Sequence, residues 1–176
     1  RLLPDSMAGI VVGHCVGSGI GEEPGLNSLG LIDLTDTFHF DKTQMLSLQN
    51  MGVLFVREER YQGVQQYRIN IGITSSFKES AADGFILSRT IVDEILRRIA
   101  FEGLTFIKAK ESESNRAALE SVISGIINEF ITNEYVYREG TSITVTDGGN
   151  STFYVTGNIK PMRSVMSIEV NTTITA

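Results

Sequence analysis

The fold is decided by the stretch Ile91-Val92-Asp93-Glu94-Ile95-Leu96-Arg97-Arg98-Ile99, in which large aliphatic residues recur at the spacing of one helix face. This pattern predicts an amphipathic helix from near Asp83 to Glu102, with Gly103 just beyond its end as a stop signal. The acidic and basic residues lie opposite the isoleucine row and suit i,i+4 pairing, which is typical of a helix face in water. The aliphatic face must therefore be buried.

A second amphipathic helix is predicted from about Asn115 to Asn133, behind Ser114 as the candidate N-cap residue. We expect the two helices to form most of the hydrophobic core. The apolar stripe of the second helix consists of Leu119, Val122, Ile123, Ile126, Ile127 and Phe130.

Strand patterns precede and follow these helices. Val53-Leu54-Phe55-Val56 is β-prone and Tyr67 to Gly72 alternates, which predicts a hairpin that turns across Tyr61-Gln62-Gly63. After Thr141 apolar residues alternate again around a turn at Gly148-Gly149-Asn150, which predicts a second hairpin. The predicted fold class is α+β, with paired amphipathic helices on a mixed or antiparallel sheet, a C-terminal hairpin and a terminal strand.

The first fifty residues carry weaker signals. The stretch from Met7 to Val16 fits either a short helix or a buried strand, and its four-residue spacing of apolar residues favours the helix. Glycines crowd the segment from Gly17 to Leu29, which predicts a loop. Asp41 is a good N-cap for a helix from Lys42 to Asn50, which would end at Gly52. The expected apolar side of this helix is Met45, Leu46 and Leu48.

The composition fits one globular domain over residues 1–176. The chain has 176 residues, of which 41% are hydrophobic and 20% charged. Its 15 basic and 21 acidic residues give a net charge of −6, the wrong sign for a dedicated nucleic-acid binder. No apolar run approaches the roughly 20 residues of a membrane-spanning helix, so we expect no membrane insertion. The missing initial Met suggests a fragment or a trimmed chain.

The candidate chemical motifs are weak. The spacing of the Gly17 to Gly25 loop fails both the dinucleotide and the P-loop pattern. Cys15 with His39 as its base is conceivable, but Cys15 stands among valines and isoleucines and fits a buried apolar residue better. The acidic pairs lack a metal-loop pattern. We therefore expect no catalytic residue, no metal and no cofactor.

The longest strand signal lies at the C-terminus. From residue 166 to residue 175 apolar and polar residues alternate, and the chain stops at Ala176. The strand belongs either to an internal sheet or, over residues 162–176, to a sheet in a neighbouring copy to which it is donated. Its apolar side consists of Met166, Ile168, Val170, Thr172 and Ile174.

The order of these elements resembles the C-terminal inner domain of the contractile-tail sheath proteins of myophages, R-type bacteriocins and related contractile injection systems. The resemblance spans nearly the whole chain. It rests on Ser6-Met7-Ala8-Gly9-Ile10-Val11-Val12-Gly13, Glu23-Pro24-Gly25-Leu26-Asn27 leading to Gly30-Leu31-Ile32, Asn50-Met51-Gly52-Val53-Leu54, Ile71-Gly72-Ile73-Thr74-Ser75, the paired helices and Val155-Thr156-Gly157-Asn158-Ile159-Lys160-Pro161-Met162.

The resemblance implies a structural subunit, not an enzyme, that polymerises around a tail tube and drives it by contraction. Its partners would be neighbouring copies and the tube protein, with no nucleic acid, in a virion tail assembled in the host cytoplasm. The donated strand would be received by a hairpin whose residues are Ile143, Val145, Phe153 and Val155. The alternatives are a small cytosolic α/β enzyme or nucleotide-binding domain that uses the Gly17–Gly25 loop, or another tail or baseplate component.

Overall fold

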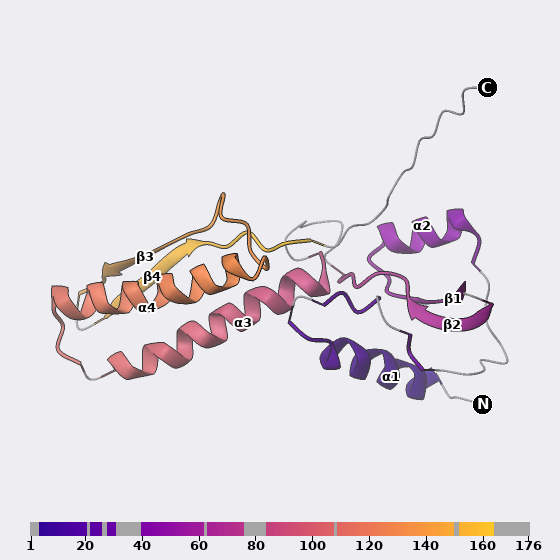
Figure 1. Ribbon diagram of the computed structural model, residues 1–176, viewed down its shortest axis with the longest axis horizontal. Coiled ribbons are helices and arrows are strands. Elements are labelled where there is room, and N and C mark those ends of the chain that lie inside the picture. The colour runs from indigo at the N-terminus through magenta and orange to yellow at the C-terminus, as the bar shows by residue number, and fades with distance from the viewer. Residues whose placement is uncertain are drawn as a thin grey trace, which may run out of the picture.

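The computed structural model describes residues 4–20, 22–25, 28–30, 40–61, 63–75, 84–107, 109–149 and 152–163. The fold is α+β, as the sequence predicts, and Figure 1 shows two groups of elements joined end to end. One group holds α3, α4 and the hairpin β3–β4, and the other holds α1, α2 and the hairpin β1–β2. The bounds are α1 Pro4–Gly17, α2 Lys42–Asn50, β1 Val56–Tyr61, β2 Val64–Ile69, α3 Ile86–Gly103, the short 3-10 helix η1 Leu104–Phe106, α4 Glu113–Thr132, β3 Ser142–Asp147 and β4 Phe153–Asn158.

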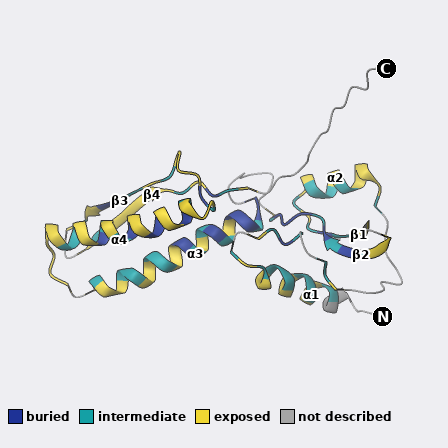
Figure 2. Cartoon of the chain, in the orientation of Figure 1, coloured by how far each residue is buried: buried dark blue, intermediate teal, exposed yellow. Residues whose placement is uncertain are grey.

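The α3–α4 pair forms the largest core cluster, which confirms the two predicted stripes in outline. Ile95 and Ile123 are fully buried, whereas Leu96 is 51% exposed although the pattern placed it on the buried face. Figure 2 shows the deepest burial where α3 begins. The buried members of the cluster are Leu87, Ile91, Ile95, Ile126, Ile127, Phe130 and Val136.

Both helices begin at residues other than the predicted ones. Helix α4 is capped by Ser112, not Ser114, because Ser112 is extended and its hydroxyl accepts a hydrogen bond from the amide of Asn115 at 3.2 Å. Helix α3 begins at Ile86 because the residues before it pair with the segment after β2. The amide of Thr74 donates to Gly84 at 2.9 Å, and this pairing holds the chain extended until the helix starts.

The strands pair in the antiparallel sense, which is one of the two predicted arrangements, and they form two small sheets. The described residues form two separate two-stranded antiparallel sheets, β1–β2 and β3–β4, and no parallel pair. The hairpin β3–β4 and its turn are placed as predicted. The first hairpin begins later than predicted. The amide of Val53 donates to the carbonyl of Leu48 at the end of α2, and of the predicted strand residues 53–56 only Val56 belongs to β1. Its buried residues Tyr67 and Ile69 lie beside a smaller cluster of Ile71, Ile73 and Phe85.

The N-terminal helices lie in the same group of elements as the first hairpin (Figure 1). Helix α1 confirms the helical interpretation, and α2 has the predicted bounds and the predicted Asp41 cap. No residue of α2 is fully buried. On its expected apolar side Met45 and Leu48 are half-buried, whereas Leu46 is 51% exposed. The loop after α1 is fastened to the segment after β2, because Gly72 donates its amide to the Glu23 carboxylate. Pro24 is buried there.

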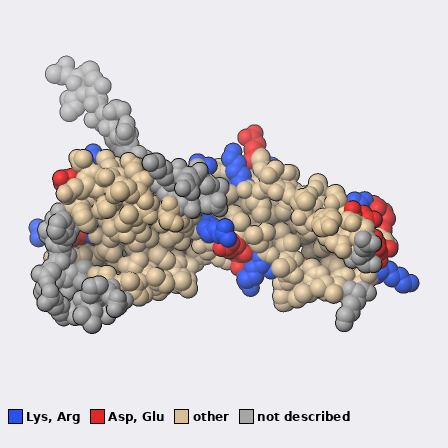
Figure 3. Space-filling view, turned by 180° about the vertical axis from the view of Figure 1, so that it is seen from behind, with Lys and Arg blue, Asp and Glu red and all other residues tan. Residues whose placement is uncertain are grey.

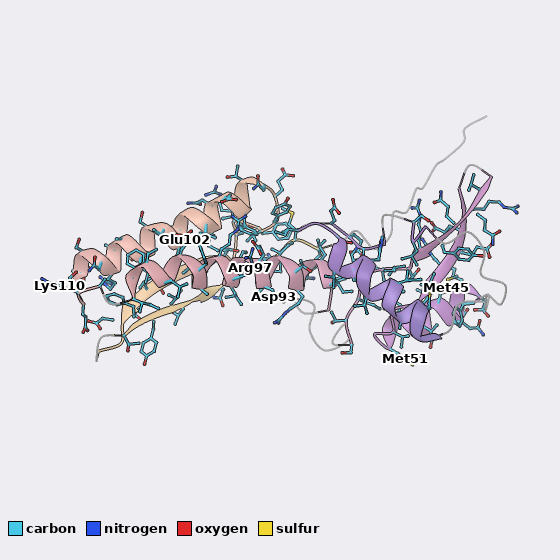
Figure 4. The ribbon with its side chains drawn as sticks, turned by 90° about the horizontal axis from the view of Figure 1, so that it is seen from below. Met45, Met51, Asp93, Arg97, Glu102 and Lys110 are labelled. Carbon is cyan, nitrogen blue, oxygen red and sulfur yellow. The ribbon has the colours of Figure 1, made fainter. Side chains whose placement is uncertain are left out.

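Ion pairs lie along α3, and one of them connects α3 to α4. Glu94 accepts hydrogen bonds from Arg97 at 2.7 Å and from Arg98 at 3.1 Å, and Arg98 also reaches Glu129 of α4 at 2.8 Å. Figure 3 shows blue and red atoms side by side over the middle of α3, and Figure 4 places Asp93, Arg97 and Glu102 along that helix. Hydrogen bonds from Arg97, with the charges of both arginines, lower the pKa of the Glu94 carboxyl.

The lowered pKa of Glu94 predicts a pH-dependent contribution to stability. Glu94→Gln is expected to lower the free energy of unfolding by about 0.5–1 kcal/mol at neutral pH, since ion pairs in water contribute little. A carboxyl with a lowered folded pKa stabilises above its ordinary value of 4.5 and loses that contribution as pH falls through the folded pKa. Denaturant unfolding from pH 7 to pH 3 should therefore show the variant and the parent chain converging in acid.

The matched control is Glu102→Gln on the same helix, because Glu102 forms no side-chain ion pair within the described residues. Its stability difference from the parent should be small and flat with pH. A difference for Glu94→Gln that persists unchanged at pH 3 would contradict the assigned ion pairs.

Gly157 fixes the register of the β3–β4 hairpin. A Cβ atom at this position would lie 2.8 Å from Cα of Ile143, the residue directly opposite, which is closer than such atoms approach in proteins. Gly157→Ala is therefore expected to destabilise the chain by about 1–3 kcal/mol through crowding. Gly125→Ala is the control, because that site on α4 is open and alanine favours a helix by about 1 kcal/mol. Equal unfolding midpoints for the two variants would show that the register is different.

Candidate assembly interface

The β3–β4 hairpin presents open strand edges. Its strands pair from Ser142 opposite Asn158 to Asp147 opposite Phe153. In the part of the chain that the structure describes, no third strand pairs with this sheet on either side. Backbone amides and carbonyls along an open edge can bond to an added strand, although the carbonyl of Val145 on β3 already accepts a hydrogen bond from Arg116 at 3.1 Å. The hairpin is therefore a candidate acceptor for a strand from another molecule.

The inner face of this hairpin packs on the chain's own helices. Val145 is 2% exposed and lies against Leu119 and Ile123 of α4, and both Ile143 and Phe153 are partly buried against the same cluster. Three of the four residues predicted to receive a strand therefore belong to the core of this chain. Any strand that docks here has to bind along an edge, because the inner face is occupied.

Strand β4 is the more exposed strand of the pair. Val155 is 41% exposed although it lies directly opposite the buried Val145, and Tyr154 is 56% exposed on the other face. Two apolar side chains of β4 therefore remain accessible, one on each face. A strand added beside β4 would satisfy backbone groups and cover part of both side chains.

The segment after β4 returns to the core and pairs with the loop after α4. The amide of Tyr137 donates to the carbonyl of Lys160 at 2.9 Å, and the amide of Met162 donates to the carbonyl of Tyr135 at 2.9 Å. The hydroxyl of Ser88, which is fully buried, donates to the carbonyl of Met162 at 3.0 Å. Neither segment has the alternation of a strand, so the sequence does not predict that they pair.

These bonds bear on the segment that was predicted to be donated, residues 162–176. Met162 is its first residue and is bound by its own chain, so the part that remains for donation begins after Arg163. The five side chains predicted to pack the donated strand lie outside the described residues. They are Met166, Ile168, Val170, Thr172 and Ile174.

The candidate nucleophile lies in an environment that suppresses its reactivity. Cys15 is half-buried on α1, and burial together with the nearby Glu23 carboxylate raises the pKa of its thiol. A raised pKa leaves less thiolate at neutral pH and so a weaker nucleophile. The neighbouring His14 has its Nε2 atom 2.8 Å from the carbonyl of Pro24, and His39 lies outside the described residues.

The described residues hold no candidate metal site. No three His, Cys, Asp or Glu side chains among them come together as metal ligands. Of the helices in this part of the chain, none is long and apolar enough to cross a membrane.

Comparison with known proteins gives matches in structure alone. No protein-family model and no curated protein matches the sequence. A chain in the cryo-EM structure of the anti-feeding prophage baseplate matches with a TM-score of 0.75 and 14% identity, over 97% of this chain and 49% of that one.

Two contracted sheaths contain similar chains. One is the PVC sheath complex of an extracellular contractile injection system, with a TM-score of 0.71 and 12% identity over 96% of this chain. The other is the helical sheath of the anti-feeding prophage, with a TM-score of 0.72 and 14% identity over 96% of this chain. The chain spans about half the length of the chains it matches, 49% in each case. The resemblance drawn from the sequence is confirmed for the fold, which this chain shares with chains of a prophage baseplate and of two contracted sheaths.

Proposed function

We propose that this chain is a structural, non-enzymatic part of a contractile tail or injection assembly, and more specifically of a sheath subunit that polymerises around a tail tube. The observation that carries the proposal is the shared fold over 96–97% of the chain, with TM-scores of 0.71 to 0.75. The proposed partners are neighbouring copies and the tube protein, within a virion-like tail. A baseplate component is the second candidate, because one of the matched chains lies in a baseplate.

The proposed mechanism is mechanical. A helical sheath contracts when its subunits change their packing while remaining linked, so each subunit needs a rigid body and a link to its neighbours. The α3–α4 core supplies a rigid body, and the edge of β4 supplies a place where a link can be anchored. We propose that the segment after Arg163 is the link and pairs with such an edge on a neighbouring copy.

The enzymatic alternative receives less support. It used the Gly17–Gly25 loop with Cys15 or His39. The raised pKa of Cys15 weakens the thiol as a nucleophile, and Glu23 of the loop is bonded to the Gly72 amide within the chain. Both observations favour a structural use of this segment.

Deletion of the residues after Arg163 tests the proposed link. The α3–α4 core and the Met162 bonds remain in the deleted protein, so it should still unfold cooperatively. It should no longer form tubular polymers, because the donated strand is absent. Circular dichroism would report the fold and electron microscopy the polymer, on the same samples. Loss of both signals would place the segment in the subunit's own fold, and retention of both would remove it from assembly.

A single substitution tests the same link without shortening the chain. Ile168→Asp forces a charge onto the predicted buried side of the strand, which costs several kcal/mol and should abolish polymers. Ser167→Asp adds the same charge on the alternate side and is the matched control. Polymers of both variants, or of neither, would contradict the predicted alternation.

A further inference from the structure

Two arginines face each other across the first hairpin. Arg57 on β1 lies directly opposite Arg68 on β2 in the antiparallel register. Their side chains share one face of the hairpin with Glu59 and Gln66, because these positions alternate with the buried Tyr67. Like charges directly opposite each other destabilise a strand pair. The pairing therefore needs a compensating anion.

Among the residues that the structure describes, one carboxylate, that of Glu59, contacts the two guanidinium groups. One oxygen of Glu59 contacts Nη2 of Arg57, and the other lies 3.8 Å from Nε of Arg68. A further contact of this group is neutral, since Nη2 of Arg68 donates to the amide oxygen of Gln66 at 2.8 Å. Two positive charges and one negative charge leave this face with an excess of one positive charge.

Both arginines also keep an unsatisfied donor. The Nε atoms of Arg57 and Arg68 are enclosed and have no hydrogen-bond partner. The side chains themselves are 40% and 26% exposed, so their outer nitrogens reach the surface. Buried donors are nearly always paired in folded proteins. The enclosed Nε atoms cannot be reached from outside, so an anion from another molecule would bind the exposed outer nitrogens, next to the excess positive charge.

The geometry of arginine and the charge of the chain together favour a carboxylate. A guanidinium group is planar and donates two parallel hydrogen bonds, which match two oxygens of a carboxylate or of a phosphate. The chain is acidic, with 21 acidic against 15 basic residues, so a second copy offers many carboxylates. Glu134 and Glu139, for example, are exposed and form no ion pair within the described residues.

We propose that Arg57 and Arg68 form a carboxylate-binding site that an Asp or Glu side chain of a second copy fills. The inference rests on the proposed function, since it requires copies to associate. It adds a contact between copies that is separate from strand addition, because it lies on the β1–β2 hairpin and not on β4.

Zero-length cross-linking tests this contact. Arg57→Lys and Arg68→Lys keep the charge and introduce an amine that a carbodiimide couples to a carboxylate in contact with it. Arg60→Lys is the control, because Arg60 is exposed on the opposite face of β1. Each variant is first checked by circular dichroism, then coupled over a series of concentrations, and the products are identified by mass spectrometry. Coupling to Glu59 within one chain shows that the new amine is reactive.

The proposal predicts cross-linked products between copies for the variants at positions 57 and 68, in a yield that rises with protein concentration. The control variant at position 60 should give no such products. Coupling to Glu59 alone, or equal products between copies at all three positions, would overturn it. A second experiment titrates the protein with inorganic phosphate. A saturable shift of the Arg57 and Arg68 Nε–H signals in NMR with phosphate, and no product between copies, would indicate a free-anion site and would also overturn it.

Electron microscopy of the unmodified protein separates this inference from the proposed function. Tubular polymers without the predicted cross-links would leave the sheath role standing and remove the carboxylate contact. Cross-links at positions 57 and 68 without polymers would support the contact and count against the sheath role.

Discussion

The start of α3 is the junction on which the rest of the structure depends. Its first residues bond to both halves of the molecule: Ile86 donates its amide to Gly72 beyond the first hairpin, and Ser88 binds Met162 beyond the second. Ser88 is fully buried, so the bond from its hydroxyl lies out of water and is costly to break. The same turn carries Leu87 and Ile91 into the α3–α4 core. One helix start therefore connects the two hairpins and the C-terminal segment.

This junction determines how the chain could carry force in the proposed assembly. A pull on the segment after Arg163 reaches Met162 first, where bonds to Tyr135 and Ser88 pass it to α4 and α3. The load then spreads over the apolar contact between the two helices, which resists sliding because its side chains interlock. The hairpin β3–β4 packs on α4 through Val145 and its neighbours. A strand bound at its edge would therefore also be connected to the helical core.

The sequence predicts the elements well where a long apolar stripe sets the period. The helices α3 and α4, the short helix α2 and both hairpin turns lie where their patterns place them. The predicted boundaries are wrong where a hydrogen bond to a distant segment determines where an element begins. Helix α3 begins late because residues before Ile86 pair with the segment after β2, and β1 begins late because Val53 is bound to the end of α2. No local pattern contains either bond.

The candidate interface is less predictable than the fold for the same reason. Alternation identifies Ile143, Val145 and Phe153 as one face of a hairpin, but only packing shows that α4 already covers that face. The opposed arginines are separated by ten residues in sequence, and their position on one face depends on a register that the turn sets. The pattern placed the first strand too early, so it could not reveal them. Register, more than residue type, limits what the sequence alone can say about a surface.

The division into two small sheets has a consequence for assembly. A two-stranded hairpin is marginal in water and needs a helix or a third strand for support. The β3–β4 hairpin obtains support on one face from α4, through Val145 and its neighbours, while β4 keeps an open edge with Val155 exposed. A third strand would add backbone bonds that this chain lacks among its described residues. The hairpin thus has support from α4 and an edge at which a strand could be added, which is the combination that the proposed polymerising subunit requires.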